Sequence, residues 1–171
     1  MKKCYVIIGR GDIPTDFPRK ELGEYFSLKA KIMGGEILSK EESDRFEELN
    51  KSLRKWKRNN RNDEYWEGFF DVISHIMRNV GTSVYFGFYD YCSPSITEAI
   101  DRAVKNGCKR IIVAPVMIIP GDRVCEIEIK ERLEFSKILH PEAEIIYAWP
   151  YPEEEIADFI IKQIERFDND K

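Results

Sequence analysis

The chain has 171 residues, a length that suits one domain with its own hydrophobic core. Its 31 acidic and 27 basic side chains are mixed, so the overall charge favours neither nucleic acid nor an anionic membrane, and any anion site must be built locally. The apolar run at residues 4–8 is too short for a signal-peptide core, and no segment approaches the roughly 20 apolar residues of a membrane helix. We therefore expect a cytoplasmic protein.

A buried strand and a helix open the chain. Residues 3–8 are rich in Tyr, Val and Ile and are followed by Gly9-Arg10-Gly11, which predicts a short strand that leaves the sheet at a glycine turn. Either Thr15 or Asp16 can cap the next helix, which is expected to run to about Met33.

The stretch 40–58 predicts a charged surface helix, capped by Ser39 or Ser43. Its first half is acidic and its second half basic, which complements the helix dipole at both ends. A narrow apolar stripe predicts packing on another helix, within the subunit or in a dimer: Phe46, Leu49, Leu53 and Trp56. The run 54–61 mixes cations with one aromatic residue, as nucleic-acid-binding segments do, but the acidic half of the same helix argues against that partner.

The remainder of the chain alternates helices and strands. Ser93 is expected to cap a helix begun by Pro94. The other expected elements are strands at 83–88, 110–118 and 144–148, and helices at 63–79, 126–139 and 153–167. The last helix is expected to bury one stripe: Ile156, Phe159, Ile160, Ile164 and Phe167. Strands separated by helices predict an α/β three-layer sandwich, with a mainly parallel four-stranded sheet and helices on both faces.

The four cysteines are scattered, with no Cys-x-x-Cys pair and no histidine at zinc-finger spacing. They are expected to be reduced and mostly buried, because cytosolic disulfides are rare. Cys125 is the exception, since it follows Pro120-Gly121 and stands beside Glu126 and Glu128, where a thiolate and carboxylates could meet a metal.

Three polar loops follow predicted strands, at residues 9–12, 89–91 and 120–123. In open α/β sheets, ligands bind beyond the carboxyl ends of the strands. The three loops should therefore gather at one edge of the sheet and form its binding site.

The order and spacing of several motifs resemble the class II chelatases, the sirohydrochlorin cobalto-, ferro- and nickel-chelatases. The first strand of that family typically ends in Gly-His-Gly-Ser, where this chain has Gly9-Arg10-Gly11-Asp12. An acidic residue typically precedes a Pro-Ser helix start, as Asp90 precedes Pro94-Ser95 here. The third strand is usually followed by Gly-Gly-His-Val, which corresponds here to Gly121-Asp122-Arg123-Val124. The similarity covers the first strand and most of the chain from Ser83 onward.

The resemblance implies a single chelatase-like domain at 1–171, with a charged helical insertion at about 39–62. It also implies a homodimer, with the site between subunits or close to a shared cleft. The implied reaction inserts divalent cobalt, nickel or iron into a tetrapyrrole, so that the metal is a substrate, and no certain resident cofactor is expected. Neither a membrane nor nucleic acid is an expected partner.

Arginine stands at both positions where the family has a histidine. Imidazole can ligate a metal as a neutral base, whereas a guanidinium stays protonated and offers only donors, so Arg10 and Arg123 cannot bind the metal. They can instead bind the carboxylates of an anionic tetrapyrrole, beside Gly11, Asp12, Tyr89 and Gly121. The alternative is that both arginines are structural and pair with Asp12, Asp90 or Asp122.

Asp90, Cys125 and Glu126 are the candidate catalytic residues that would replace the missing imidazoles, with Glu128 beside them. The competing interpretation is ordinary solvated loop charge. The metal ligands remain unknown, because His75 and His140 match no ligand position of the family and are expected to be structural or exposed.

Three functions follow from these observations. The first is a metal chelatase acting on sirohydrochlorin or a relative. The second is a non-catalytic binding protein for an anionic tetrapyrrole or another carboxylated or phosphorylated small molecule. The third is a scaffold whose charged helix at 40–58 joins a partner.

Overall fold

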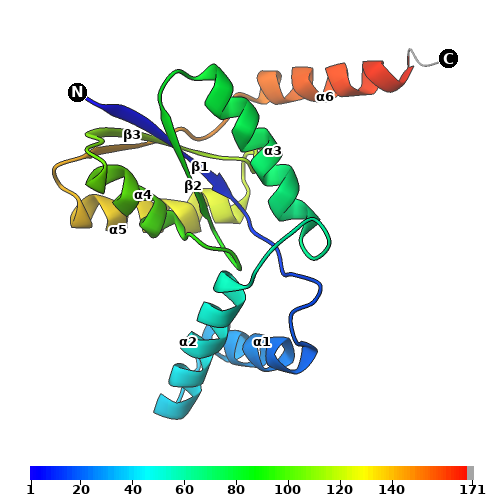
Figure 1. Cartoon of the computed structure of the whole chain (residues 1–171), viewed down its shortest axis with the longest axis vertical. Helices are drawn as coiled ribbons and strands as arrows, with labels where there is room; N and C mark the ends of the chain where they lie inside the picture. The colour runs from blue at the N-terminus through cyan, green and yellow to red at the C-terminus, as the bar shows by residue number, and fades with distance from the viewer. Residues whose placement is uncertain (169–171) are drawn as a thin grey trace.

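The computed structural model describes residues 1–168, and within them four parallel strands form one sheet in the order β2-β1-β3-β4. The strands are β1 (Lys3–Gly9), β2 (Ser83–Phe88), β3 (Arg110–Pro115) and β4 (Glu144–Tyr147). The helices are α1 (Arg19–Met33), α2 (Lys40–Lys55), α3 (Glu64–Asn79), α4 (Ile96–Lys105), the π-helix η1 (Val124–Ile129), α5 (Lys130–Leu139) and α6 (Glu153–Asp168). The predicted α/β fold with a parallel four-stranded sheet is confirmed (Figure 1).

The two faces of the sheet are covered to different extents. The face toward α4 and α5 is fully buried, as Val6 of β1 and Val113 of β3 show. The opposite face meets α3, where Phe69 and Ile73 pack on the β2 side. Burial alternates along β3 between fully and half-buried residues, so the α3 side of this strand is only partly covered.

A separate apolar cluster joins α1 to α2 beyond one end of the sheet (Figure 1). Leu49 and Leu53 of the predicted stripe are buried in it against Tyr25 and Leu28 of α1. Packing of this stripe on another helix of the same subunit is therefore confirmed. Because these side chains are buried, they cannot be the surface through which a scaffold would contact a partner. Ser39 caps α2 in a full capping box with Glu42, as predicted, although the helix ends at Lys55.

Two predicted helix caps are wrong. Neither Thr15 nor Asp16 caps α1, which starts after Pro18 without a side-chain cap, because the Asp16 carboxylate instead accepts hydrogen bonds from Trp56 and Asn62. Ser95, not Ser93, caps α4. The Phe88 N–H donates to the Pro94 carbonyl, so the residues before Ser95 run beside the end of β2 and the helix starts later.

The prediction that all four cysteines are reduced is wrong for Cys4 and Cys108, which form a disulfide with their Cα atoms 6.0 Å apart. Cys4 lies on β1 opposite Ile111 of β3, and this parallel register brings the turn before β3 next to it. Cys92 is free and buried, as predicted, and Cys125, the expected exception, is free and buried as well.

The last helix departs most from expectation. Ile156 is the only buried residue of α6 within the described chain, whereas Phe159 is 65% exposed and Phe167 is 73% exposed. The hydroxyl of Tyr151 donates to the Pro115 carbonyl just before α6 begins, and from there the helix projects away from the sheet (Figure 1). Within residues 1–168, no helix has the length and apolar character needed to cross a membrane.

The α1–α2 cluster makes a prediction about stability. Replacing Leu53, which is 0% exposed, by Ala should lower the free energy of unfolding by about 2–5 kcal/mol, because it removes buried methyl groups and leaves a cavity. The control is Ile37→Ala, at a position 98% exposed, which should change almost nothing. Urea unfolding followed by circular dichroism measures both, and equal effects would contradict the assigned packing.

Candidate functional site

The three predicted loops meet at the carboxyl edge of the sheet. The backbone N–H groups of Tyr89 and Asp90 donate to the carbonyls of Gly9 and Arg10, at 2.9 and 2.8 Å. The Arg10 guanidinium lies 3.3 Å from the Asp122 carboxylate and so reaches the third loop. The expectation that the loops gather is confirmed, and of the structural pairings considered for Arg10 the one with Asp122 forms.

Gly11 permits the close approach of the first two loops. Its φ is +88°, and a Cβ atom at this position would lie 2.0 Å from the Asp90 carbonyl oxygen. No other residue fits there without moving the loop that follows β2 at residues 89–91, which we call the β2 loop. Tyr91 also adopts a positive φ of 53°, directly after Asp90.

A cleft of about 650 Å³ opens between α1 and η1 beside these loops, a size typical of small-molecule sites. Its apolar lining includes Phe26 and Ile127. Its charged lining comprises Lys29, Arg123, Glu128 and Glu131, while Tyr89 and Tyr91 contribute aromatic rings with polar ends. Such a lining suits a flat, partly apolar ligand that carries charges at its rim.

Lys29 and Asp90 form a tight ion pair at one wall of the cleft, with Nζ 2.6 Å from a carboxylate oxygen. The ammonium also lies 4.8 Å from the centre of the Tyr91 ring. Burial opposes the charge of Lys29, but the hydrogen bond and charge of Asp90 outweigh this effect and raise the pKa of Lys29. Asp90 is therefore the counter-ion of a lysine in this structure.

Tyr89, Glu128 and Arg123 form the opposite wall. The Tyr89 hydroxyl donates to the Glu128 carboxylate, and Arg123 lies 3.8 Å from the same carboxylate. Burial, together with the hydrogen bond to Glu128, raises the pKa of Tyr89 to about 12, so its hydroxyl remains a donor at neutral pH. The Arg123 side chain is 81% exposed and can turn toward a ligand.

The three candidate catalytic residues have separate partners. Asp90 pairs with Lys29, while Glu126 accepts hydrogen bonds from Lys130 and Trp149, which lower the pKa of its carboxyl. Cys125 is buried, with its Sγ 3.7 Å from the Met117 carbonyl oxygen. Among residues 1–168, no three His, Cys, Asp or Glu side chains are grouped so that they could hold a metal ion.

The candidate substrate-binding residues divide into two groups. Tyr89 and Arg123 line the cleft, whereas Asp12 lines a different, smaller hollow beside Asn62. Gly121 has a φ of +86° and donates its N–H to Glu126 at 3.4 Å. Sequence reasoning missed Lys29 and Glu131 altogether, because no short motif marks them and only the position of α1 opposite η1 and α5 brings them to one cleft.

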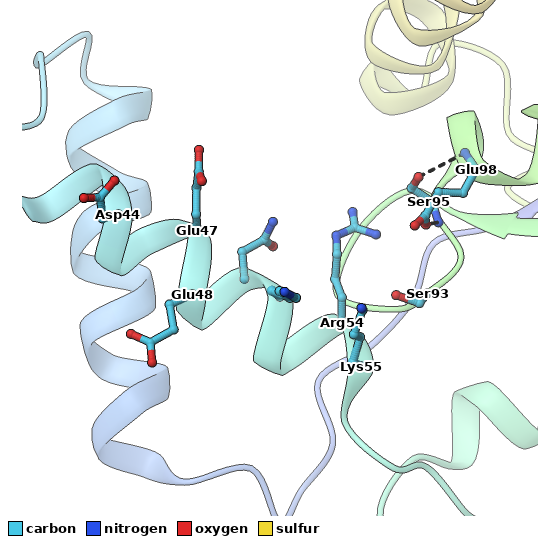
Figure 2. A pocket seen from close by; sticks show the side chains of 10 residues that line it. Asp44, Glu47, Glu48, Arg54, Lys55, Ser93, Ser95 and Glu98 are labelled. Carbon is cyan, nitrogen blue, oxygen red and sulfur yellow. Dashed lines mark hydrogen bonds between the residues drawn. The ribbon is translucent and has the colours of Figure 1, made fainter. Parts of the chain in front are cut away.

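A second hollow, of about 740 Å³, lies between α2 and the start of α4 (Figure 2). Its lining mixes acidic residues of α2 with Lys51 and Lys55. Arg54 is already engaged, since it donates to the carbonyls of Cys92 and Tyr89 at 2.6 and 3.1 Å. Ser95 and Glu98 are bound to each other in the capping box of α4. This hollow is therefore lined by polar and charged side chains where two helices meet. We assign the candidate site to the cleft between α1 and η1 instead.

The buried thiols make a prediction about reactivity. Burial raises the pKa of both Cys92 and Cys125 to about 11, so at about pH 8 both stay protonated and should resist alkylation in the native protein. Mass spectrometry after iodoacetamide treatment should find both unmodified, while the same treatment in denaturant should modify both. Rapid modification of Cys125 in the native protein would contradict this prediction and would show that Cys125 is a reactive thiolate.

Comparisons with known proteins agree with the resemblance seen in the motifs. Residues 58–166 match the CbiX family. The sirohydrochlorin cobaltochelatase of Sulfurisphaera tokodaii is 29% identical over 101 residues, which cover 58% of this chain and 80% of that protein.

Two solved structures share the fold. The sirohydrochlorin chelatase SirB from Bacillus subtilis subspecies spizizenii, in complex with cobalt, has a TM-score of 0.56 and 14% identity over 97% of this chain. The match covers 51% of SirB, so this chain spans about half the length of that relative. A CbiX protein of cobalamin (vitamin B12) biosynthesis from Marinobacter aquaeolei VT8 has a TM-score of 0.54 and 12% identity, over 96% of this chain and 98% of its own. Because the family match extends over residues 58–166, which is more than half of this chain, the chain belongs to the CbiX family of class II chelatases.

Proposed function

We propose that this chain is a sirohydrochlorin-type chelatase, which binds a carboxylated tetrapyrrole in the cleft between α1 and η1 and inserts divalent cobalt, nickel or iron. The observation that carries the proposal is the lining of this cleft, where aromatic rings, two cations and two carboxylates meet at the carboxyl edge of the sheet. Membership of the CbiX family and the relative named as a sirohydrochlorin cobaltochelatase support the same substrate class.

The lining suits binding of a tetrapyrrole. A macrocycle is flat and apolar, and the rings of Phe26 and Tyr91 and the side chain of Ile127 offer it apolar contact. Its rim carboxylates require cations. Arg123, whose side chain is mostly exposed, can form paired hydrogen bonds with one of them, and Lys29 lies at the other wall.

Metal insertion also requires a proton acceptor. The reaction replaces two pyrrole N–H protons by one divalent ion, so two protons must leave the macrocycle. We assign the first acceptor role to Glu128, because its carboxylate lines the cleft and is held by Tyr89 and Arg123. Glu131, three residues further along, is the other carboxylate of the cleft, and we assign it the second acceptor role, so that both pyrrole protons have a destination. In this scheme Arg123, at one of the family's two histidine positions, binds substrate, Arg10 pairs with Asp122, and carboxylates replace the imidazoles.

A second candidate function is a carrier that binds the tetrapyrrole without inserting metal. It is favoured by the lack of a three-residue metal cluster in the part of the chain that the structure describes, together with Arg10 and Arg123 at the motif positions. The two functions share the cleft and differ in whether bound pigment acquires metal faster than free pigment.

We also propose that the charged segment at about 39–62 is an insertion into a single chelatase-like domain. The support is that α2 packs with α1 in a separate apolar cluster and that the family match, residues 58–166, leaves out α2 together with α1 and β1.

The role of Arg123 can be tested by pigment binding. Arg123→Met should weaken binding of sirohydrochlorin by about tenfold, because it removes one charge-assisted contact from a position outside the core. Arg102→Met, on α4, is the matched control and should bind as the unmodified protein does. An anaerobic absorbance titration measures both, and an unchanged affinity in Arg123→Met would remove this residue from the site.

The role of Glu128 can be tested by metal insertion. With cobalt added to bound sirohydrochlorin, the unmodified protein should insert metal faster than the protein-free solution. Glu128→Gln should slow insertion by about a hundredfold while still binding pigment, because a neutral amide cannot accept the pyrrole proton. Glu126→Gln should have little effect, since its carboxylate is engaged by Lys130 and Trp149. Pigment binding without faster insertion in the unmodified protein would favour the carrier.

A further inference from the structure

Lys29 is the cation of the cleft whose position is fixed by its surroundings. Its Nζ atom lies 4.8 Å from the centre of the Tyr91 ring and 5.6 Å from that of Tyr25. Tyr25 is fully buried between α1 and α2, so it gives the ammonium a rigid support. Arg123, the other cation of the cleft, is mostly exposed and has no comparable support. A ligand therefore meets one charge at a defined point and one that can move.

Asp90 holds Lys29 from behind the cleft. One oxygen of the Asp90 carboxylate accepts from Lys29 at 2.6 Å, and the other accepts from the backbone N–H of Tyr91 at 3.0 Å. The Asp90 N–H is bound to the Arg10 carbonyl at 2.8 Å, which fixes the backbone as well. Lys29 belongs to the lining of the cleft, whereas Asp90 does not. The carboxylate can reach a ligand only by giving up these contacts, so its role in the structure is to place the ammonium.

The ammonium keeps donor capacity for a ligand. It has three N–H donors and no acceptor. Asp90 accepts one hydrogen bond and Tyr25 is close enough to accept a second, which leaves at least one N–H for a molecule in the cleft. The Lys29 side chain is 25% exposed, so a ligand can reach it, and an ion pair formed at such a partly buried position is stronger than one in water.

We propose that Lys29 selects and orients the ligand of the cleft, by binding one carboxylate at the edge of a flat, apolar molecule, and that Asp90 is the residue that positions it. A site with a fixed donor rejects a molecule that lacks the matching acceptor, because the donor is then left unpaired. The inference rests on the proposed function in taking this cleft as the ligand site. It requires a flat carboxylate there, of which a tetrapyrrole is one example.

Lysine acetylation measures whether a ligand covers Lys29. The protein is treated with an N-hydroxysuccinimide ester of acetate, and each lysine is quantified by mass spectrometry. Saturating sirohydrochlorin should slow acetylation of Lys29 by at least about tenfold. Trimesate, a benzene ring with carboxylates at its rim, should also protect it at higher concentration. Lys31 is the internal control, because it lies on the same helix, pairs with Glu42 and does not line the cleft.

Variants test the charge itself. The double change Lys29→Met with Asp90→Asn removes both charges, so that no unpaired ion is left, and should weaken pigment binding by at least about tenfold. Lys29→Arg should keep most of the affinity, because the positive charge stays. Asp90→Asn alone should still bind pigment, since the amide oxygen can accept from Lys29 and a competing negative charge is gone. Circular dichroism checks that each variant is folded.

The outcomes separate this inference from the proposed function. Protection of Lys29 by trimesate but not by sirohydrochlorin would support its role and contradict the tetrapyrrole function. Pigment binding that leaves Lys29 unprotected, or that is equally tight in the double variant, would overturn the role of Lys29 and leave the tetrapyrrole function standing. Failure of both ligands to protect Lys29 would also overturn it.

Discussion

The buried ion pair between Arg58 and Asp63 joins the end of α2 to α3 and to the loops that follow β1 and β2. Their side chains are 4% and 1% exposed, and the guanidinium also donates to the carbonyls of Asp12, Tyr91 and Leu53. A charge is tolerated at this depth only with an opposite charge and several hydrogen bonds. Asp63 additionally caps α3. One pair thus connects the end of α2, both loops beneath the site and the first turn of α3.

Arginines also hold the β2 loop from two sides. Arg54 of α2 donates to the carbonyls of Tyr89 and Cys92, and Arg132 of α5 donates to the Tyr89 carbonyl at 2.7 Å. The Arg132 guanidinium also lies 4.6 Å from the centre of the Tyr89 ring. The backbone that presents Tyr89 and Asp90 to the cleft is therefore fixed by side chains outside it. The charged segment around α2 supports the site although it contributes no residue to the cleft.

Local patterns predicted most of the fold, and the errors arise where distant segments meet. Periodicity placed β2 at its observed bounds, and capping chemistry limited the cap of α2 to Ser39 or Ser43, of which Ser39 is the one observed. The Cys4–Cys108 disulfide depends on the register of two parallel strands, which no local pattern contains. For α6, the sequence predicted an apolar stripe correctly, but periodicity does not say which surface covers it.

The candidate site was predicted at the level of loops and only partly at the level of residues. Strand ends correctly predicted that the three loops gather, because this follows from parallel topology. The direction of Glu126 and Glu128 could not be predicted, since these residues lie in a π-helix whose turn differs from the α-helical period. Lys29 enters the cleft only through the packing of the α1–α2 cluster.

In the loop that follows β1, at residues 9–12, the contacts that fix the backbone are distinct from the side chain presented at residue 10. At residue 10 the backbone N–H donates to the Tyr65 hydroxyl and the carbonyl accepts from Asp90, while Gly11 sets the distance to the neighbouring loop. None of these contacts uses the side chain of Arg10, which is 53% exposed. The side chain at position 10 can therefore change while all of these backbone contacts stay in place. A scaffold built in this way can acquire a new specificity through a single codon.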